Sequence, residues 1–141
     1  MRRFLIDTPI LGAGLFRRPA ALQLLRPFIA NQEAATSIVT YGELIEHVRS
    51  RPNFDQHRND LRDLLGEVTP YFLTYNIMER YADIRRQLRP PHGPGLIGDI
   101  DTLIAATALE RNLTVVTTDS DFERVPGLKV MIIPRRTLET R

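Results

Sequence analysis

Six acidic residues of the chain lie where short apolar runs end or where helical patterns begin. They are Asp7, Glu43, Asp99, Asp101, Asp119 and Asp121. Asp7 directly follows one apolar run, and Asp119 follows another after one further residue. Four or more carboxylates at one place repel each other and have raised pKa values unless cations neutralise them. The pattern therefore favours a site for divalent metal ions.

The available ligand types narrow the choice of metal. The sequence has no cysteine and only three histidines, so these acids would offer oxygen ligands alone. Oxygen ligands suit Mg²⁺ or Mn²⁺ better than Zn²⁺. Two such ions can activate a water molecule and stabilise the leaving oxygen of a phosphodiester. Hydrolysis of a phosphodiester is thus the chemistry that this set of residues suggests.

Each acid also has an ordinary structural explanation, which stays open at this stage. The alternatives are a helix start at Thr8 and Pro9 beside Asp7, a capping box over Thr40-Tyr41-Gly42-Glu43, a helix cap at Asp99 or Asp101, and an Asx-type turn over Asp119-Ser120-Asp121. Ser, Thr or Asn would serve as caps equally well. The conjunction of several carboxylates is what favours the metal site.

The elements that must position these acids alternate along the chain. Strands are predicted at Phe4 to Ile6, Ala34 to Ser37, Val68 to Leu73, Thr114 to Thr117 and Val130 to Ile133. Helices are predicted at Pro9 to Phe16, Ala20 to Ala30, Thr40 to Arg49 and His57 to Leu65, around Ile77 to Leu88, and around the alanine-rich Leu103 to Ala108. The alternation predicts an α/β fold of three layers, a mainly parallel sheet with helices on both faces. Ligands of such sheets lie beyond the carboxyl ends of the strands, where the acids are expected.

Composition limits the class of protein. The 141 residues are 43% hydrophobic and 26% charged, as expected of one domain spanning residues 1–141. The lack of cysteine excludes Cys-based zinc sites, Cys nucleophiles and a disulfide scaffold. No apolar stretch approaches the roughly 20 residues of a membrane span, and Asp7 and Pro9 interrupt the apolar run near the start. We therefore expect a cytoplasmic protein with no membrane partner.

The charge balance has two explanations. Nineteen basic residues, eighteen of them arginine, accompany seventeen acids and give a net charge of +2. Codon bias explains the excess of arginine, but guanidinium groups also bind phosphates bidentately, which would suit a nucleic acid. If four acids form a metal-neutralised pocket, 13 acids remain against 19 basic residues. An acidic pocket in a basic surround is what a metal-dependent enzyme acting on a nucleic acid would need.

Four segments of the chain resemble the PIN domain, and in particular the VapC-type toxin ribonucleases of type II toxin–antitoxin systems. The segments are FLIDT at 4–8, SIVTYGEL at 37–44, IGDIDTLIAATA at 97–108 and VVTTDSDF at 115–122. Together they span nearly the whole chain, and the third and fourth are the most specific. The resemblance implies a PIN-like sheet with strand order 3-2-1-4-5 and a metal-dependent endoribonuclease that uses Mg²⁺ or Mn²⁺.

The resemblance also assigns roles to individual residues by their positions in these segments. It implies Asp7, Glu43, Asp101 and Asp119 as catalytic metal ligands, Asp99 as a candidate further ligand, and Thr8, Thr117 and Asp121 as supporting residues. The chain departs from the family at Pro9, where asparagine is usual. Any hydrogen bond that the asparagine makes is therefore absent or moved in this chain.

Partners follow from the resemblance as well. It implies an RNA substrate, a VapB-like antitoxin that covers the acidic edge, and a homodimer of the toxin. Arg85, Arg86 and Arg89 come shortly before the acids at 99 and 101, and they are candidates for contacts with RNA phosphates. A solvated helix face explains these arginines equally well.

Two other functions compete with the nuclease. One is a non-catalytic PIN-like domain that binds nucleic acid or protein, and Pro9 is its only support. The other is a phosphatase or phospho-receiver, which also places an Asp after an early strand but needs a lysine near the phosphoryl group. Lys129 is the only lysine of the chain, and no second Asp follows Asp7 at two residues.

Overall fold

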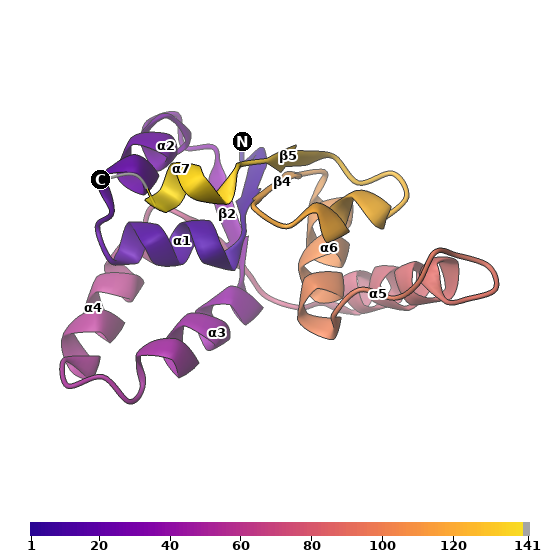
Figure 1. Cartoon of the computed structure of the whole chain (residues 1–141), viewed down its shortest axis with the longest axis horizontal. Helices are drawn as coiled ribbons and strands as arrows, with labels where there is room; N and C mark the ends of the chain where they lie inside the picture. The colour runs from indigo at the N-terminus through magenta and orange to yellow at the C-terminus, as the bar shows by residue number, and fades with distance from the viewer. Residues whose placement is uncertain (140–141) are drawn as a thin grey trace.

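Five parallel strands form one sheet in the computed structural model, which describes residues 1–139 (Figure 1). The strands are β1 (Phe4–Ile6), β2 (Ala34–Ser37), β3 (Thr69–Tyr71), β4 (Thr114–Thr117) and β5 (Val130–Ile132). Their order is β3-β2-β1-β4-β5, and every neighbouring pair is parallel. The predicted strand order and parallel sheet are confirmed. The third and fifth strands are shorter than predicted.

Alternate residues of the central strands point to opposite faces of the sheet, because side chains along a strand alternate in direction. Leu5 of β1 and Val115 of β4 are paired in register and belong to one buried core. Ile6 and Val116, the next residues along, belong to the core on the other face. Each face is therefore apolar and needs its own layer of helices.

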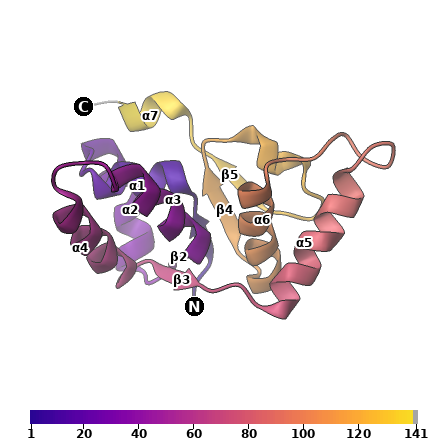
Figure 2. The ribbon, with the colours of Figure 1, turned by 90° about the horizontal axis from the view of Figure 1, so that it is seen from below.

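Helices supply those two layers. They are α1 (Thr8–Leu15), α2 (Pro19–Ala30), α3 (Ile38–Val48), α4 (Phe54–Leu65), α5 (Tyr75–Leu88), α6 (Asp99–Arg111) and α7 (Arg135–Glu139), with a short 3-10 helix η1 (Ser120–Arg124). The first four helices lie on one side of the sheet, and α5 and α6 lie on the other (Figure 2). The three-layer α/β arrangement is thus confirmed. Within residues 1–139, none of the helices has the length and apolar character needed to cross a bilayer.

The start of α3 differs from the sequence-based prediction. Ser37, the last residue of β2, caps α3 by accepting a hydrogen bond from the Val39 amide at 3.2 Å. The helix therefore begins at Ile38, and the predicted capping box over residues 40–43 lies inside it. Glu43 consequently lies in the second turn of α3, where its side chain is free to face the carboxyl edge of the sheet.

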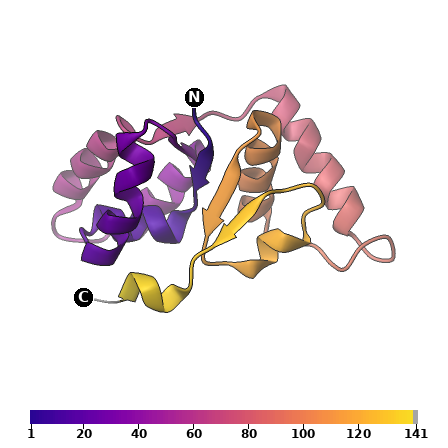
Figure 3. The same cartoon turned by 90° about the horizontal axis from the view of Figure 1, so that it is seen from above.

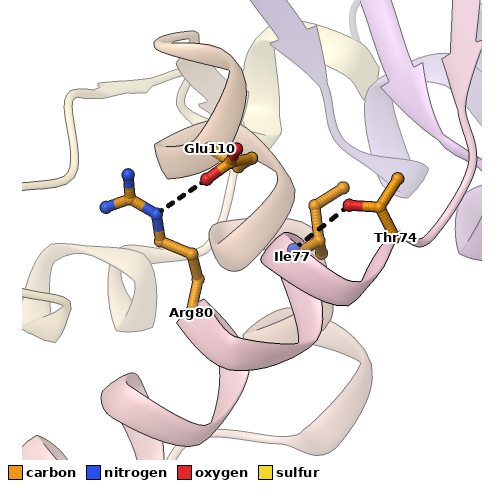
Figure 4. A network of polar contacts seen from close by, with 4 residues as sticks. All are labelled: Thr74, Ile77, Arg80 and Glu110. Carbon is orange, nitrogen blue, oxygen red and sulfur yellow. Dashed lines mark hydrogen bonds and ion pairs between the residues drawn. The ribbon is translucent and has the colours of Figure 1, made fainter.

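One polar contact in Figure 4 caps helix α5, and the other joins α5 to α6. Thr74 caps α5 by accepting a hydrogen bond from the Ile77 amide at 3.2 Å. Arg80 donates from Nε to Glu110 Oε1 at 3.1 Å, which joins the start of α5 to the end of α6. The pairing is antiparallel, so the loop after α5 returns the chain to the carboxyl edge, where α6 begins (Figure 3).

The last helix has no counterpart among the predicted elements. α7 packs against α2, and Leu138 is buried in the core on that face (Figure 1). It brings the end of the chain back over the helices that follow β1. The carboxyl edge of the sheet thereby gains a wall from the C-terminal segment.

Candidate active site

Asp7 lies at the junction of β1 and α1, where both its carboxylate oxygens accept hydrogen bonds. It caps α1, with Oδ1 accepting from the Thr8 amide at 2.8 Å. Oδ2 accepts from the Thr117 hydroxyl at 2.6 Å. Because Asp7 is almost fully buried, these two bonds fix its carboxylate at the carboxyl edge of the sheet. The helix-cap explanation is thus confirmed for Asp7, and its role in a metal site stays a prediction.

Thr117 connects this acid to the end of β4. Its Oγ1 accepts from the Asp119 amide at 3.0 Å while its hydroxyl donates to Asp7. Asp119 in turn accepts from the Asp121 amide at 2.9 Å through Oδ1, which is the predicted Asx-type turn and caps η1. One buried hydroxyl group therefore contacts the carboxylate of Asp7 and the backbone of Asp119, the acids that follow two neighbouring strands.

A second threonine positions Glu43. The Thr8 hydroxyl donates to Glu43 Oε1 at 2.5 Å and also lies 3.1 Å from Oγ1 of Thr40, which is fully buried. Because Thr8 has a single proton to donate, Thr40 is the donor in the second contact. The three side chains link the start of α1 to α3 and hold Glu43 at the edge of the sheet.

The four predicted ligands line one open cavity of about 800 Å³. They are Asp7, Glu43, Asp101 and Asp119. The structure thus brings together acids that are up to 112 residues apart in sequence, counted from Asp7 to Asp119. Pro9 also lines the cavity, as the second residue of α1. Proline at this position suits a helix start and offers no side-chain hydrogen bond.

Burial and mutual repulsion raise the pKa of two of these acids. Burial is the main cause at Asp7, where the bonds from Thr117 and Thr8 oppose the rise and the charges of Glu43 and Asp119 add to it. At Asp101, burial followed by the charge of Asp7 raises the pKa to about 6. The carboxylates of the site therefore repel one another, which favours their protonated form at Asp7 and Asp101.

Ion pairing separates these acids from the other two candidates. Within residues 1–139, none of the four cavity acids forms a salt bridge. Asp99 pairs with Arg85 at 2.6 Å, and Asp121 pairs with Arg124 at 3.2 Å. Neither Asp99 nor Asp121 lines the cavity. The structure thus groups four of the six acids and places the other two in ion pairs beside them.

The four acids fit a divalent cation in chemistry. They offer hard oxygen ligands and uncompensated charge, which is what Mg²⁺ and Mn²⁺ require. Among the described residues, however, no three acidic or histidine side chains converge closely enough to hold an ion as they stand. The donor set is therefore suitable, and the present side-chain rotamers do not form a complete ligand group.

The predicted RNA-contacting arginines lie apart from the cavity. Arg85 is engaged by Asp99, and Arg86 and Arg89 are exposed at the end of α5. None of the three lines the cavity.

Several cavity residues escaped the sequence-based prediction. The cavity is also lined by Phe16, Arg18, His47 and Arg135. Thr40 does not line it but contacts the Thr8 hydroxyl, which does. Arg135 belongs to α7, which was not predicted at all. A four-residue step from Glu43 places His47 on the same face of α3, and this was the one signal available in the sequence.

Comparisons with known proteins identify the family and support the fold. The PIN domain family model matches residues 4–128. A chain of VapBC2 from Rickettsia felis, bound to a DNA fragment from its promoter, is 23% identical with a TM-score of 0.80, covering 92% of this chain and 98% of that one. The comparison with curated protein sequences returned no match.

Two further solved structures are slightly more similar in sequence. A chain of FitAcB from Neisseria gonorrhoeae is 26% identical with a TM-score of 0.68, covering 91% of this chain and 96% of that one. A chain of VapBC-5, a member of the VapBC family of toxin-antitoxin systems from Mycobacterium tuberculosis, is 26% identical with a TM-score of 0.58, covering 72% and 81%. The resemblance found in the sequence is confirmed: the chain belongs to the PIN domain family, and its structural neighbours include VapBC structures, one of them named as a member of the VapBC family of toxin-antitoxin systems.

Proposed function

We propose that the chain is a metal-dependent endoribonuclease that acts as the toxin of a type II toxin–antitoxin pair. The observation that carries the proposal is the set of four carboxylates in one cavity, none of them in a salt bridge within residues 1–139. Such a set is costly for a protein that uses it only for caps, because its charges repel. It is useful to a protein that binds divalent cations.

In this proposal Asp7, Glu43, Asp101 and Asp119 hold one or two Mg²⁺ or Mn²⁺ ions. A bound ion supplies the charge that activates a water molecule for attack on an RNA phosphodiester and stabilises the departing oxygen. Thr117 keeps Asp7 oriented, and the hydrogen bond that it donates lowers the pKa of the Asp7 carboxyl against the rise caused by burial. Thr8 orients Glu43 by donating a hydrogen bond to its Oε1.

The ionisation of Asp101 matters to this chemistry. With its pKa raised to about 6, Asp101 is partly protonated in slightly acid solution and must lose that proton before it can bind a cation. Nuclease activity should therefore rise with pH through this range. Asp99 remains a candidate for a further metal only if its ion pair with Arg85 opens.

A protein partner completes the proposal. The VapBC neighbours, one of them named a toxin-antitoxin system, support a VapB-like antitoxin for this chain. We also propose a homodimer and a cytoplasmic location, where RNA is accessible to a toxin. Contacts of Arg86 and Arg89 with RNA phosphates belong to the same proposal, and their exposure is compatible with it.

A non-catalytic PIN domain is the second candidate. Two observations favour it: Pro9 stands in place of the usual asparagine, and no complete three-ligand group is formed among the described residues. A domain of this kind would bind nucleic acid or protein without a metal. Titration with metal separates it from the nuclease, because only the nuclease requires saturable binding.

The deciding experiment measures cleavage of RNA by the purified chain with and without metal. We expect cleavage with Mg²⁺ or Mn²⁺, loss of activity in EDTA, and recovery when metal is restored. Products should carry 5′-phosphate and 3′-hydroxyl ends. Asp7→Asn keeps the shape of the side chain and removes its charge, so full activity in that variant would refute the proposal.

A further inference from the structure

The carboxylate of Asp101 is held differently from the carboxylates of the other three cavity acids. Those three accept hydrogen bonds from Thr8, Thr117 and Asp121. Within residues 1–139, no hydrogen bond is donated to the Asp101 carboxylate. Asp101 lies in the first turn of α6, and the N-cap residue of that helix, Gly98, makes no side-chain bond. The position of this acid relative to the others therefore depends on how the start of α6 is held.

The loop before α6 is anchored at several points. Gly95 donates its amide to the Leu88 carbonyl at 2.8 Å, with a φ of +127° that favours glycine. Ile97 is buried in the core on the α5–α6 face of the sheet. The Gly95 carbonyl accepts a hydrogen bond from Nη1 of Arg124 at 3.4 Å. The loop is thus tied to η1 as well as to the helix that precedes it.

Arg124, the last residue of η1, uses both terminal nitrogens of its guanidinium group. Nη1 donates to the Gly95 carbonyl, and Nη2 lies 3.2 Å from Asp121 Oδ1. The Asp121 amide in turn donates to Oδ1 of the cavity acid Asp119 at 2.9 Å. Neither Arg124 nor Asp121 lines the cavity. A continuous set of contacts therefore runs outside the cavity from Asp119, through η1, to the loop that leads into Asp101.

We propose that Arg124 is a positioning residue for the metal site. By joining η1 to the loop before α6, it sets the separation of Asp119 and Asp101. The guanidinium group suits this role because its two terminal nitrogens donate in a fixed relative geometry. Mg²⁺ holds its ligand atoms at about 2.0–2.1 Å in near-octahedral geometry, so a small change in this separation should weaken its binding. The inference rests on the proposed metal-dependent function and adds to it a residue outside the cavity.

Two other roles for Arg124 predict different results. If only its positive charge mattered, removing that charge would tighten the binding of a divalent cation, because like charges repel. If it served only the fold, its removal would lower stability and leave the metal affinity of the folded protein unchanged. A positioning role predicts weaker metal binding. The pair with Asp121 is partly exposed and contributes little to stability, so the variants should fold.

The test measures the Mg²⁺ affinity of the full metal-free chain by isothermal titration calorimetry. It is done at about pH 8, above the pKa of about 6 of Asp101. Arg124→Gln should weaken binding about 10- to 100-fold, the range for residues that orient metal ligands. Arg124→Lys keeps the charge but has one nitrogen in place of two, so it should weaken binding by nearly the same factor. Arg80→Gln is the matched control, because it opens the 3.1 Å pair with Glu110 at the other end of α6; it should change the affinity by less than about twofold.

A double-mutant cycle tests whether the two contacts of Arg124 act as one bridge. Asp121→Asn opens the bridge at η1 and should also weaken Mg²⁺ binding. If both substitutions remove the same bridge, the double variant should bind Mg²⁺ no more weakly than the weaker of the two single variants. Independent roles would multiply the two losses.

Two further measurements report on the bridge in other ways. Hydrogen exchange of the amides of residues 95–101 in the metal-free chain should be faster in Arg124→Gln and unchanged in Arg80→Gln. RNA cleavage by Arg124→Gln should need a Mg²⁺ concentration higher by the factor lost in affinity. Most of the wild-type rate should return at saturating Mg²⁺, because the variant keeps every proposed ligand.

The outcomes separate this inference from the proposed function. Weaker Mg²⁺ binding in both Arg124 variants, but not in Arg80→Gln, supports the positioning role. Affinities equal to that of the wild type, or tighter binding in Arg124→Gln, overturn the positioning role and leave the nuclease proposal standing. Circular dichroism checks the fold: an unfolded Arg124→Gln together with full affinity in Arg124→Lys also overturns the role, because Arg124 then serves the fold. No saturable Mg²⁺ binding by the wild type refutes the proposed function, and the positioning role with it.

Discussion

The ion-paired acids of the α5–α6 layer and the acids of the cavity are treated differently by the same fold. On the outer layer, Glu110 pairs with Arg80 at 3.1 Å, and Asp99 pairs with Arg85 at 2.6 Å. In the cavity, Asp7 is buried and Asp101, in the first turn of α6, is half-buried, yet neither has a cationic partner within residues 1–139. Arginine is abundant in this chain, and Arg18 and Arg135 even line the cavity, so the lack of salt bridges at its four acids within residues 1–139 is not a shortage of partners.

The difference shows where the protein gives up stability. An exposed ion pair stabilises a fold by about 0.2–1 kcal/mol at most, so the outer pairs are ordinary surface chemistry. Buried carboxylates without cations destabilise the fold, and only hydrogen bonds from Thr8 and Thr117 offset this cost at Asp7. Buried carboxylates without cationic partners are expected at a site that binds a metal cation.

The largest expected effect is on RNA cleavage. Asp101→Asn should lower activity about 10²- to 10³-fold, because it removes a charged ligand from the site of charge stabilisation. The matched variant in the outer layer is Glu110→Gln, which removes an acid already paired with arginine and should change activity by less than about twofold. Equal losses in the two variants, measured as initial cleavage rates, would erase the distinction between the two groups of acids.

Metal should stabilise the folded chain through the cavity acids alone. At 100 times its dissociation constant, Mg²⁺ should raise the free energy of unfolding by about 2.7 kcal/mol. Thermal unfolding followed by circular dichroism measures this as an upward shift of the Tm. Glu110→Gln should keep the shift, and Asp7→Asn should lose most of it. A shift of equal size in Asp7→Asn would assign the stabilising ion to some other site.

Thr117 should act on the reaction through Asp7. Thr117→Val keeps the buried volume and removes the hydroxyl that donates to Asp7 Oδ2, so the pKa of Asp7 should rise further. We expect activity to fall about 10- to 100-fold, with the pH–rate profile displaced to higher pH. Thr117→Ser should restore both. A fall in activity without displacement of the profile would indicate packing damage rather than a positioning role.

The smallest effect is on the stability of the metal-free protein. The folded pKa of Asp101 is raised from 3.8 to about 6, so the folded state binds more protons in this window and stability falls as pH rises through it. Asp101→Asn removes that cost. Since the side chain is partly exposed, we expect a gain of only roughly 1 kcal/mol above pH 6 and none below about pH 4. Urea unfolding at the two pH values measures it, and a gain that is independent of pH would contradict the assigned cause.

The sequence predicted the arrangement of the sheet better than the arrangement of side chains. Apolar runs in the sequence located each of the five strands. The rule that ligands lie at the carboxyl ends of parallel strands placed Asp7 and Asp119 at one edge of the sheet, where both line the cavity. Both depend on local patterns. The start of α3 was missed because Ser37 ends a strand and caps a helix at once, and a strand pattern hides the second role.

Contacts between distant residues were the part that could not be predicted. The buried bond between Thr8 and Thr40, the ion pair of Arg85 with Asp99, and the placement of Arg135 at the cavity each join segments that only the finished fold brings together. Residue types and spacing gave no signal for them. Asp99 is an example: its position in the segment 97–108 gave no indication that Arg85 pairs with it.

The central claim is that the four cavity acids, which form no salt bridge within residues 1–139, bind a divalent cation. Isothermal titration calorimetry of the metal-free chain with Mg²⁺ or Mn²⁺ tests it most directly. We predict saturable binding whose heat at pH 6 depends on the ionisation enthalpy of the buffer, because the ion displaces the proton of Asp101. Asp101→Asn should abolish the buffer dependence and most of the affinity. No saturable binding, or equal binding by Asp101→Asn, would contradict the account.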